Sequence, residues 1–116
     1  MDVSPVAIDL AGRLGEIAGV ADRITLRVHD LDMGLPTTPP VDLVFCHLFR
    51  DPRLDVAMVE RLKPGATLAI AALSEVGHGP GRFRMKPGEL LEAFPDLEVI
   101  SSGEADGIGW LIGRKR

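Results

Sequence analysis

The chain has 116 residues, which is most simply one domain, large enough to bury a single core. Hydrophobic residues make up 46% of the chain, so general disorder is excluded, and no apolar run approaches the roughly 20 residues of a membrane-spanning helix. The net charge of -4 argues against a nucleic-acid partner. The single cysteine, Cys46, and the lack of a signal-peptide pattern favour a cytoplasmic location.

The first predicted element is an amphipathic helix over residues 5–18. Ser4 is a typical N-cap, Pro5 suits the first helical turn, and Gly19 is placed as a stop. One apolar stripe recurs at helical spacing and consists of Val6, Leu10, Leu14 and Ile17. Apolar and polar residues then alternate over residues 24–28, which predicts a strand that ends at Asp30.

The rest of the chain alternates buried strands with helices. Residues 43–46 are apolar at successive positions, which is typical of a central parallel strand covered on both faces. A helix is predicted from Asp51 to the Lys63-Pro64-Gly65 turn, with Leu54, Met58 and Leu62 facing inward. The remaining elements are a strand over 66–73, a glycine-rich loop over 77–81, a short helix from Pro87, and strands near 97–101 and 108–112. This order predicts an α/β fold with a mainly parallel sheet.

In such a sheet, ligands bind beyond the carboxyl ends of the strands. Three places qualify: Asp2, Asp30 with Leu31, and Cys46 with His47. A carboxylate just past a strand can accept hydrogen bonds from ribose hydroxyls or from the amine of an adenine. The structural alternative is that Asp2 belongs to a frayed terminus and Asp30 only opens a turn. Spacing alone leaves both interpretations open.

The other polar candidates give weaker signals. The three histidines lack the spacing of a metal site, and Cys46 and His47 would point to opposite faces of a strand. A small buried hydrophobic role suits Cys46 better than that of a nucleophile. His47 is a weak candidate for a catalytic base, and a structural histidine is the favoured interpretation. The lone Trp110 is expected in the core.

Several stretches together resemble a known family. The series "DVSPVAIDLAGRLGEIAGVADRITLRVHDLD", "VDLVFCHLF" and "LKPGATLAIAAL" resembles the middle and end of a class I S-adenosylmethionine-dependent methyltransferase. The later "RFRMKPGELLEAFPDLEVI" is similar to the tellurite-resistance-like, small-molecule branch. The resemblance covers nearly the whole chain. It implies a Rossmann-like three-layer sandwich with an antiparallel C-terminal strand, S-adenosylmethionine as cofactor and a small-molecule acceptor.

The resemblance also assigns roles to the candidate residues. Asp2 matches the acid that holds the cofactor ribose, and Asp30 with Leu31 matches the pair that faces the adenine. Cys46 and His47 match the stretch beside the methionine end of the cofactor and the acceptor.

Family members also carry a first strand and a glycine loop before the position of Asp2, and the sequence has neither upstream. The chain thus resembles an N-terminally truncated member, so we expect cofactor binding weakened by about a hundredfold or more and little methyl transfer by this chain alone. The acid and alternating glycines from Glu75 to Gly81 are a second candidate for that loop in a permuted protein. A loop on the acceptor side is the favoured interpretation.

Assembly follows from the same comparison. In the family the first strand lies beside the fourth, so the strand over residues 41–46 is expected to have unpaired backbone groups on one side. Either the strand over residues 24–28 closes against it, or two copies pair, and we expect a homodimer. The alternative function is therefore a non-catalytic α/β interaction or dimerisation module.

Overall fold

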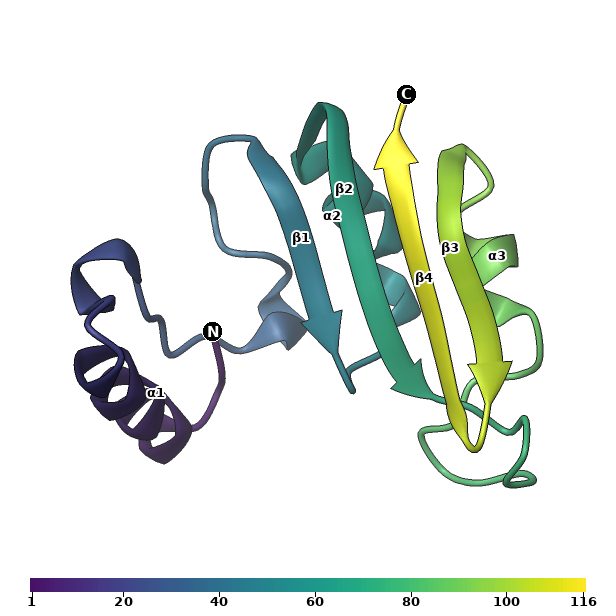
Figure 1. Cartoon of the computed structure of the whole chain (residues 1–116), viewed down its shortest axis with the longest axis horizontal. Helices are drawn as coiled ribbons and strands as arrows, with labels where there is room; N and C mark the ends of the chain where they lie inside the picture. The colour runs from purple at the N-terminus through teal and green to yellow at the C-terminus, as the bar shows by residue number, and fades with distance from the viewer. The chain divides into compact units, whose positions relative to one another are not determined.

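The computed structural model describes residues 1–116, and the chain divides into two compact units, Met1–Pro36 and Thr37–Arg116 (Figure 1). Each unit is described by itself, and the expectation of one domain stays a prediction. None of the helices has the length and apolar character that crossing a membrane requires.

The first unit is built around helix α1, Pro5–Ile17. Ser4 is its N-cap, and the Ser4 hydroxyl accepts a hydrogen bond from the Ala7 N–H at 3.2 Å. The helix is therefore confirmed with its predicted start and ends one residue early. Its apolar stripe stays exposed, and Ile17 at its end is 83% exposed.

The strand predicted over residues 24–28 does not form. Only Val28 takes part in a β-bridge, parallel to Asp2. Two hydrogen bonds make this bridge: the Asp2 N–H donates to the Arg27 carbonyl at 3.1 Å, and the His29 N–H donates to the Asp2 carbonyl at 2.8 Å. A strand needs a neighbour along its length, and here the neighbour is a single residue.

The second unit is a four-stranded sheet in the order β1-β2-β4-β3 (Figure 1). The strands are β1 Val41–His47, β2 Leu62–Leu73, β3 Leu97–Ala105 and β4 Ile108–Lys115. Only β1 and β2 are parallel, whereas β4 is antiparallel to both of its neighbours. The expectation of a mainly parallel sheet was therefore wrong, and β1 is an edge strand rather than a central one.

The hairpin between β3 and β4 explains this difference. Asp106 and Gly107 join the two strands with positive φ angles of 54° and 82°, a tight turn that fixes an antiparallel pair. β4 inserts between β2 and β3, and it is antiparallel to β2 as well. An apolar pattern shows that a strand is buried but does not give its direction.

A 3₁₀ turn over Pro52–Leu54 leads into α2, Asp55–Arg61, and α3 is Glu89–Ala93. Leu54, Met58 and Leu62 are buried as predicted. The predicted turn at Lys63-Pro64-Gly65 lies within β2 as a bulge, because the partner of Val41 is Leu62 and that of Leu43 is already Thr67. Gly65 has a φ of 81°, which suits the bulge.

Helices α2 and α3 lie on the same face of this sheet (Figure 1). On this helix face, the paired residues Ile70 and Leu111 are buried, as is Leu68 beside them. The alternate residues point to the opposite face, which we call the open face because neither α2 nor α3 covers it. Trp110 lies on the open face and is 38% exposed, so its expected place in the core was wrong.

Leu68→Ala is expected to lower the free energy of unfolding by about 2 to 5 kcal/mol, because its side chain is 0% exposed and its removal leaves a cavity. Denaturant titration followed by the fluorescence of Trp110, the single tryptophan, measures the change. Val56→Ala is the control, since Val56 is 70% exposed and should change stability by no more than about 0.5 kcal/mol. Equal losses in the two variants would contradict the assigned core.

Candidate functional site

Asp2 and Asp30 come together in the first unit. The bridge between Asp2 and Val28 is parallel, so Asp2 lies directly beside the segment that leads to Asp30. Asp2 is itself the bridging residue, and Asp30 lies two residues beyond its partner Val28, so their role as ligand-binding residues at strand ends stays a prediction. Leu31 follows Asp30, opens a 3₁₀ turn over Leu31–Met33, and is half-buried.

Each of these carboxylates also has a structural role. Asp2 Oδ1 accepts a hydrogen bond from the Ser4 N–H at 2.8 Å, and Asp30 Oδ1 accepts one from the Asp32 N–H at 2.9 Å. Turn capping of this kind is sufficient by itself to favour an aspartate at both positions. Oδ2 of each carboxylate makes no hydrogen bond, so each keeps an acceptor for a ligand.

The turn that carries Asp30 is closed by a second contact. His29 Nε2 lies 2.7 Å from the Gly34 carbonyl oxygen, across the turn. Gly34 has a φ of 87°, in the region that favours glycine. His29 is thus engaged within the turn, and no group of three His, Cys, Asp or Glu side chains in the chain is placed to hold a metal ion.

Cys46 and His47 lie on opposite faces of β1, as predicted. The Cys46 Sγ lies 3.7 Å from the Met58 sulfur of α2, on the helix face. Burial raises the pKa of the Cys46 thiol, against a smaller opposite effect of Arg50. The side chain of His47 is exposed and stacks on the Phe45 ring with centroids 6.2 Å apart. The sulfur of Cys46 is therefore directed at α2, and the backbone groups of Cys46 face β2.

A buried ion-pair cluster follows β1, and the sequence did not predict it. The Arg50 guanidinium donates to both carboxylate oxygens of Asp55 and, at 2.9 Å, to Glu89 Oε2. The Arg50 side chain is 7% exposed and lies over the Phe94 ring, 5.9 Å from its centroid. Burial alone would lower the pKa of Arg50, but its hydrogen bonds to the two carboxylates raise it above the usual value.

This cluster joins three elements: the loop after β1, the first turn of α2 and the first turn of α3. No sequence signal pointed to it, because Glu89 lies far along the chain from Arg50 and arginine–carboxylate pairs have no fixed spacing outside helices. With both partners in place each of the three guanidinium nitrogens donates a hydrogen bond, which indicates a structural role in fixing the loop.

The segment from Glu75 to Gly81 does not form a cradle for an anionic ligand. The N–H groups of His78 and Gly79 both donate to the Glu75 carbonyl, so these amides are used within the loop. No helix follows the last glycine, because α3 begins only at Glu89. The geometry therefore does not favour the permuted interpretation.

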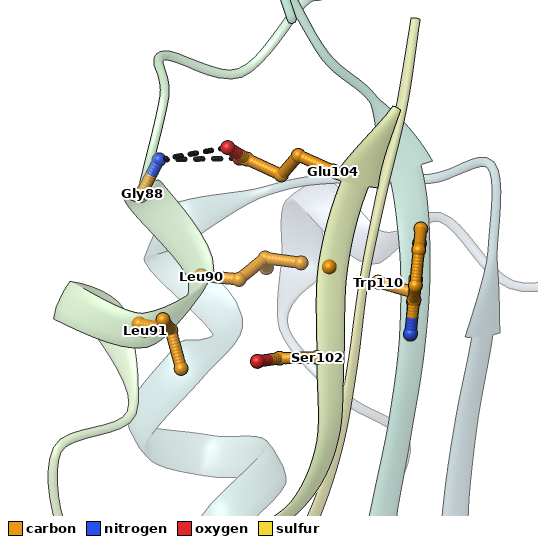
Figure 2. A pocket seen from close by; sticks show the side chains of 7 residues that line it. Gly88, Leu90, Leu91, Ser102, Glu104 and Trp110 are labelled. Carbon is orange, nitrogen blue, oxygen red and sulfur yellow. Dashed lines mark hydrogen bonds between the residues drawn. The ribbon is translucent and has the colours of Figure 1, made fainter. Parts of the chain in front are cut away.

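A small pocket lies between α3 and β3 (Figure 2). Leu90, Leu91 and Ser102 lie on the α3 side of β3, and Trp110 lies on its other side. The Glu104 carboxylate accepts hydrogen bonds from the Gly88 N–H at 3.2 Å and so holds the start of α3. The cavity of about 130 Å³ is smaller than typical ligand sites of roughly 300 to 1,000 Å³, so it does not suit a nucleoside cofactor.

No protein family and no curated protein sequence matches the chain. Solved structures match it closely. TehB from Haemophilus influenzae has a TM-score of 0.81 at 18% identity, over 97% of this chain and 48% of that chain. The chain shares this fold.

Two further structures have the same fold. The N-methyltransferase NodS from Bradyrhizobium japonicum WM9, in complex with S-adenosyl-L-homocysteine, has a TM-score of 0.67 at 18% identity, over 98% of this chain and 64% of that chain. The [4+2]-cyclase SpnF has a TM-score of 0.77 at 16% identity, over 97% of this chain and 63% of that chain.

These comparisons confirm the expected resemblance to class I methyltransferases at the level of the fold. The chain spans about half to two thirds of the length of these three proteins. One of them is described as a cyclase, so the shared fold does not determine the reaction.

Arg50→Ala is expected to lower the free energy of unfolding by about 3 to 5 kcal/mol, because it leaves Asp55 and Glu89 without their buried cation. Denaturant titration measures the loss. Arg53→Ala is the matched control: the Arg53 side chain is 68% exposed in its pair with Asp51, and a change under about 1 kcal/mol is expected. Similar effects of both variants would contradict a dominant role of the buried cluster.

Cys46 is expected to react with iodoacetamide at least about tenfold more slowly in the folded chain than in the denatured chain, because the thiolate is the reactive form and burial raises the thiol pKa. The unfolded chain then loses its thiol proton at lower pH than the folded chain, so stability should fall as pH rises past the ordinary thiol pKa. Mass spectrometry of timed samples measures the rate. Equal rates in the folded and denatured chains would refute a thiol that the fold partly shields.

Proposed function

We propose that this chain carries the adenosine-binding part of an S-adenosylmethionine-dependent methyltransferase that acts on a small-molecule acceptor. The observation that carries this proposal is the fold shared with TehB and with NodS, the latter in complex with S-adenosyl-L-homocysteine, over 97% and 98% of the chain.

The two aspartates of the first unit fit the adenosine part of this cofactor. Ribose hydroxyls and the adenine amine are hydrogen-bond donors, and Asp2 and Asp30 each keep one carboxylate oxygen free to accept. The half-buried Leu31 offers an apolar surface beside Asp30 for the adenine ring. We therefore assign Asp2 to the ribose and Asp30 with Leu31 to the adenine.

When bound, S-adenosylmethionine supplies an electrophilic methyl group on its sulfonium. The chain's own residues then act mainly by binding and orientation, because methyl transfer depends on holding donor and acceptor in line. His47, exposed at the end of β1, is the candidate to accept a proton from the acceptor. The assignment of Cys46 to the cofactor stays a prediction, since its sulfur packs against Met58 and its backbone groups face β2.

A second candidate function is a non-catalytic interaction module. The observation that favours it is the edge position of β1, whose Leu43 and Phe45 side chains are exposed. Such an edge is suited to pairing with another strand. The two candidates are separated by whether the chain binds the demethylated cofactor.

Isothermal titration of the full chain with S-adenosyl-L-homocysteine should show weak, saturable binding. Asp30→Ala is expected to weaken it about tenfold to a hundredfold, because a hydrogen bond to a charged group is lost. Asp30→Asn should weaken it similarly while its side-chain oxygen still caps the turn, so a folding defect in the turn is excluded.

Asp22→Ala is the matched control, since Asp22 is an exposed acid of the same unit that lies in a different turn, Ala21–Arg23. It should bind like the unchanged chain. Absence of saturable binding by the unchanged chain, or equal weakening by the variants at positions 22 and 30, would reject the proposed cofactor site.

A further inference from the structure

Two bulky apolar residues of the second unit have a backbone conformation that is unfavourable for them. Leu48 has a φ of 56° and Phe83 has a φ of 66°. Apart from glycines, only Asp106 in the turn between β3 and β4 shares this left-handed region, and aspartate tolerates it better. Leucine and phenylalanine are strained there, and strain of this kind is concentrated at active sites and ligand-binding sites.

β1 and β2 are parallel and end at the same edge of the sheet (Figure 1). The Leu48 N–H donates to the Ala71 carbonyl at 2.7 Å, and the Met85 N–H donates to the Leu73 carbonyl at 2.8 Å. Carbonyls two residues apart point to the same side of a strand, so Met85 takes up the side of β2 that β1 has just left. The two N–H groups are roughly 7 Å apart along β2. Phe83, two residues before Met85, is therefore brought to the end of β1.

Contacts within the second unit hold both strained residues in place. The Arg50 cluster fixes the loop that follows Leu48. Directly after Phe83, the Arg84 guanidinium donates to two backbone carbonyls, both at 2.9 Å. None of these contacts involves the first unit. The side chains themselves are not core residues, because Leu48 is 51% exposed and Phe83 is 78% exposed, so packing in the core does not explain their conformation.

The loop that carries Phe83 is basic. Residues 76–85 contain two arginines and no acid, in a chain of net charge -4. Arg84 is engaged by backbone carbonyls, whereas the Arg82 guanidinium lies over the Phe83 ring, 4.9 Å from its centroid, and has no carboxylate partner. Arginine pairs with carboxylates through two parallel hydrogen bonds. A ligand that suits this place combines a planar apolar body with a negative charge.

We propose that Leu48, Phe83 and Arg82 bind an aromatic carboxylate. Its ring lies against the two apolar side chains, and its carboxylate pairs with the Arg82 guanidinium. His47 directly precedes Leu48, so the ligand is held beside the candidate proton acceptor. Under the proposed function, on which this role rests, the aromatic carboxylate is the methyl acceptor.

Titration of the ¹⁵N-labelled full chain with 4-hydroxybenzoate, followed by two-dimensional NMR, tests this site. Saturable shifts of the Leu48 and Phe83 amide signals are expected, with a dissociation constant in the millimolar range that is usual for so small a ligand. Arg82→Ala should raise this constant at least about fivefold. Arg114→Ala is the matched control, since Arg114 is also exposed but lies at the other end of β2, opposite Thr67. Equal effects of the two variants, or no saturable shifts at Leu48 and Phe83, would overturn the proposal.

A neutral analogue tests the charge of the ligand. 4-Hydroxybenzyl alcohol should bind at least about fivefold more weakly than 4-hydroxybenzoate, because it cannot form the ion pair. Arg82→Ala should leave the dissociation constant of the alcohol unchanged. Equally tight binding of the two compounds would overturn the pairing of a carboxylate with Arg82.

Phe83→Gly tests whether the strained residue serves binding rather than folding. Glycine adopts a positive φ without strain, and the exposed ring contributes little packing, so the denaturant midpoint should be no lower than that of the unchanged chain. Binding of 4-hydroxybenzoate should weaken at least about fivefold, because the stacked ring is lost. Unchanged binding would overturn the proposal, whatever the midpoint.

These titrations contain no cofactor, so their outcome is separate from that of the proposed function. A chain that binds 4-hydroxybenzoate at these residues but does not bind S-adenosyl-L-homocysteine would support this site and reject the proposed function. A chain that binds S-adenosyl-L-homocysteine but not 4-hydroxybenzoate would overturn this site alone.

Discussion

The packing of α2 and α3 onto one face of the sheet is the constraint on which the second unit depends. Leu68 and Leu111 are 0% exposed at this contact, and their burial fixes which side of each strand points inward. Because side chains alternate along a strand, the orientation of the remaining side chains of the sheet follows from these two residues. Cys46 is turned toward α2 and His47 away from it, and Trp110 comes to lie on the open face.

The Arg50 cluster adds a fixed point at the end of β1. Its partners Asp55 and Glu89 begin two different helices, so one guanidinium sets the loop and both helix starts together. A buried cation with two carboxylates is costly unless all its donors are engaged, and burial next to Phe94 makes the geometry specific. The Arg50 cluster thus fixes the loop that follows His47, although the His47 side chain itself has no hydrogen-bonded partner.

The sequence predicted the elements that depend on local signals. Helix α1 begins at Pro5 because Ser4 caps it, and Leu54 and Met58 are buried because helical spacing places them on one face. What depends on distant partners was not predictable. Strand direction, the loss of the strand over residues 24–28 and the pairing of Arg50 with Glu89 all arise from segments that meet only in the fold. Asp2 and Asp30 were predictable only in part. The turn that each one caps depends on neighbouring residues, whereas the bridge that brings Asp2 beside the segment before Asp30 depends on a distant partner.

The sequence of β1 conflicts with its surroundings, and this conflict is informative. Apolar residues on both faces are typical of a strand that is covered twice, yet only the side toward α2 is covered within the second unit. Natural sequences agree with their structure at most levels, so a local disagreement marks a place where something else is recognised. The fold is shared by proteins with different reactions, and therefore cannot resolve this conflict. Covering only one of its two apolar faces leaves Leu43 and Phe45 of β1 exposed in the second unit.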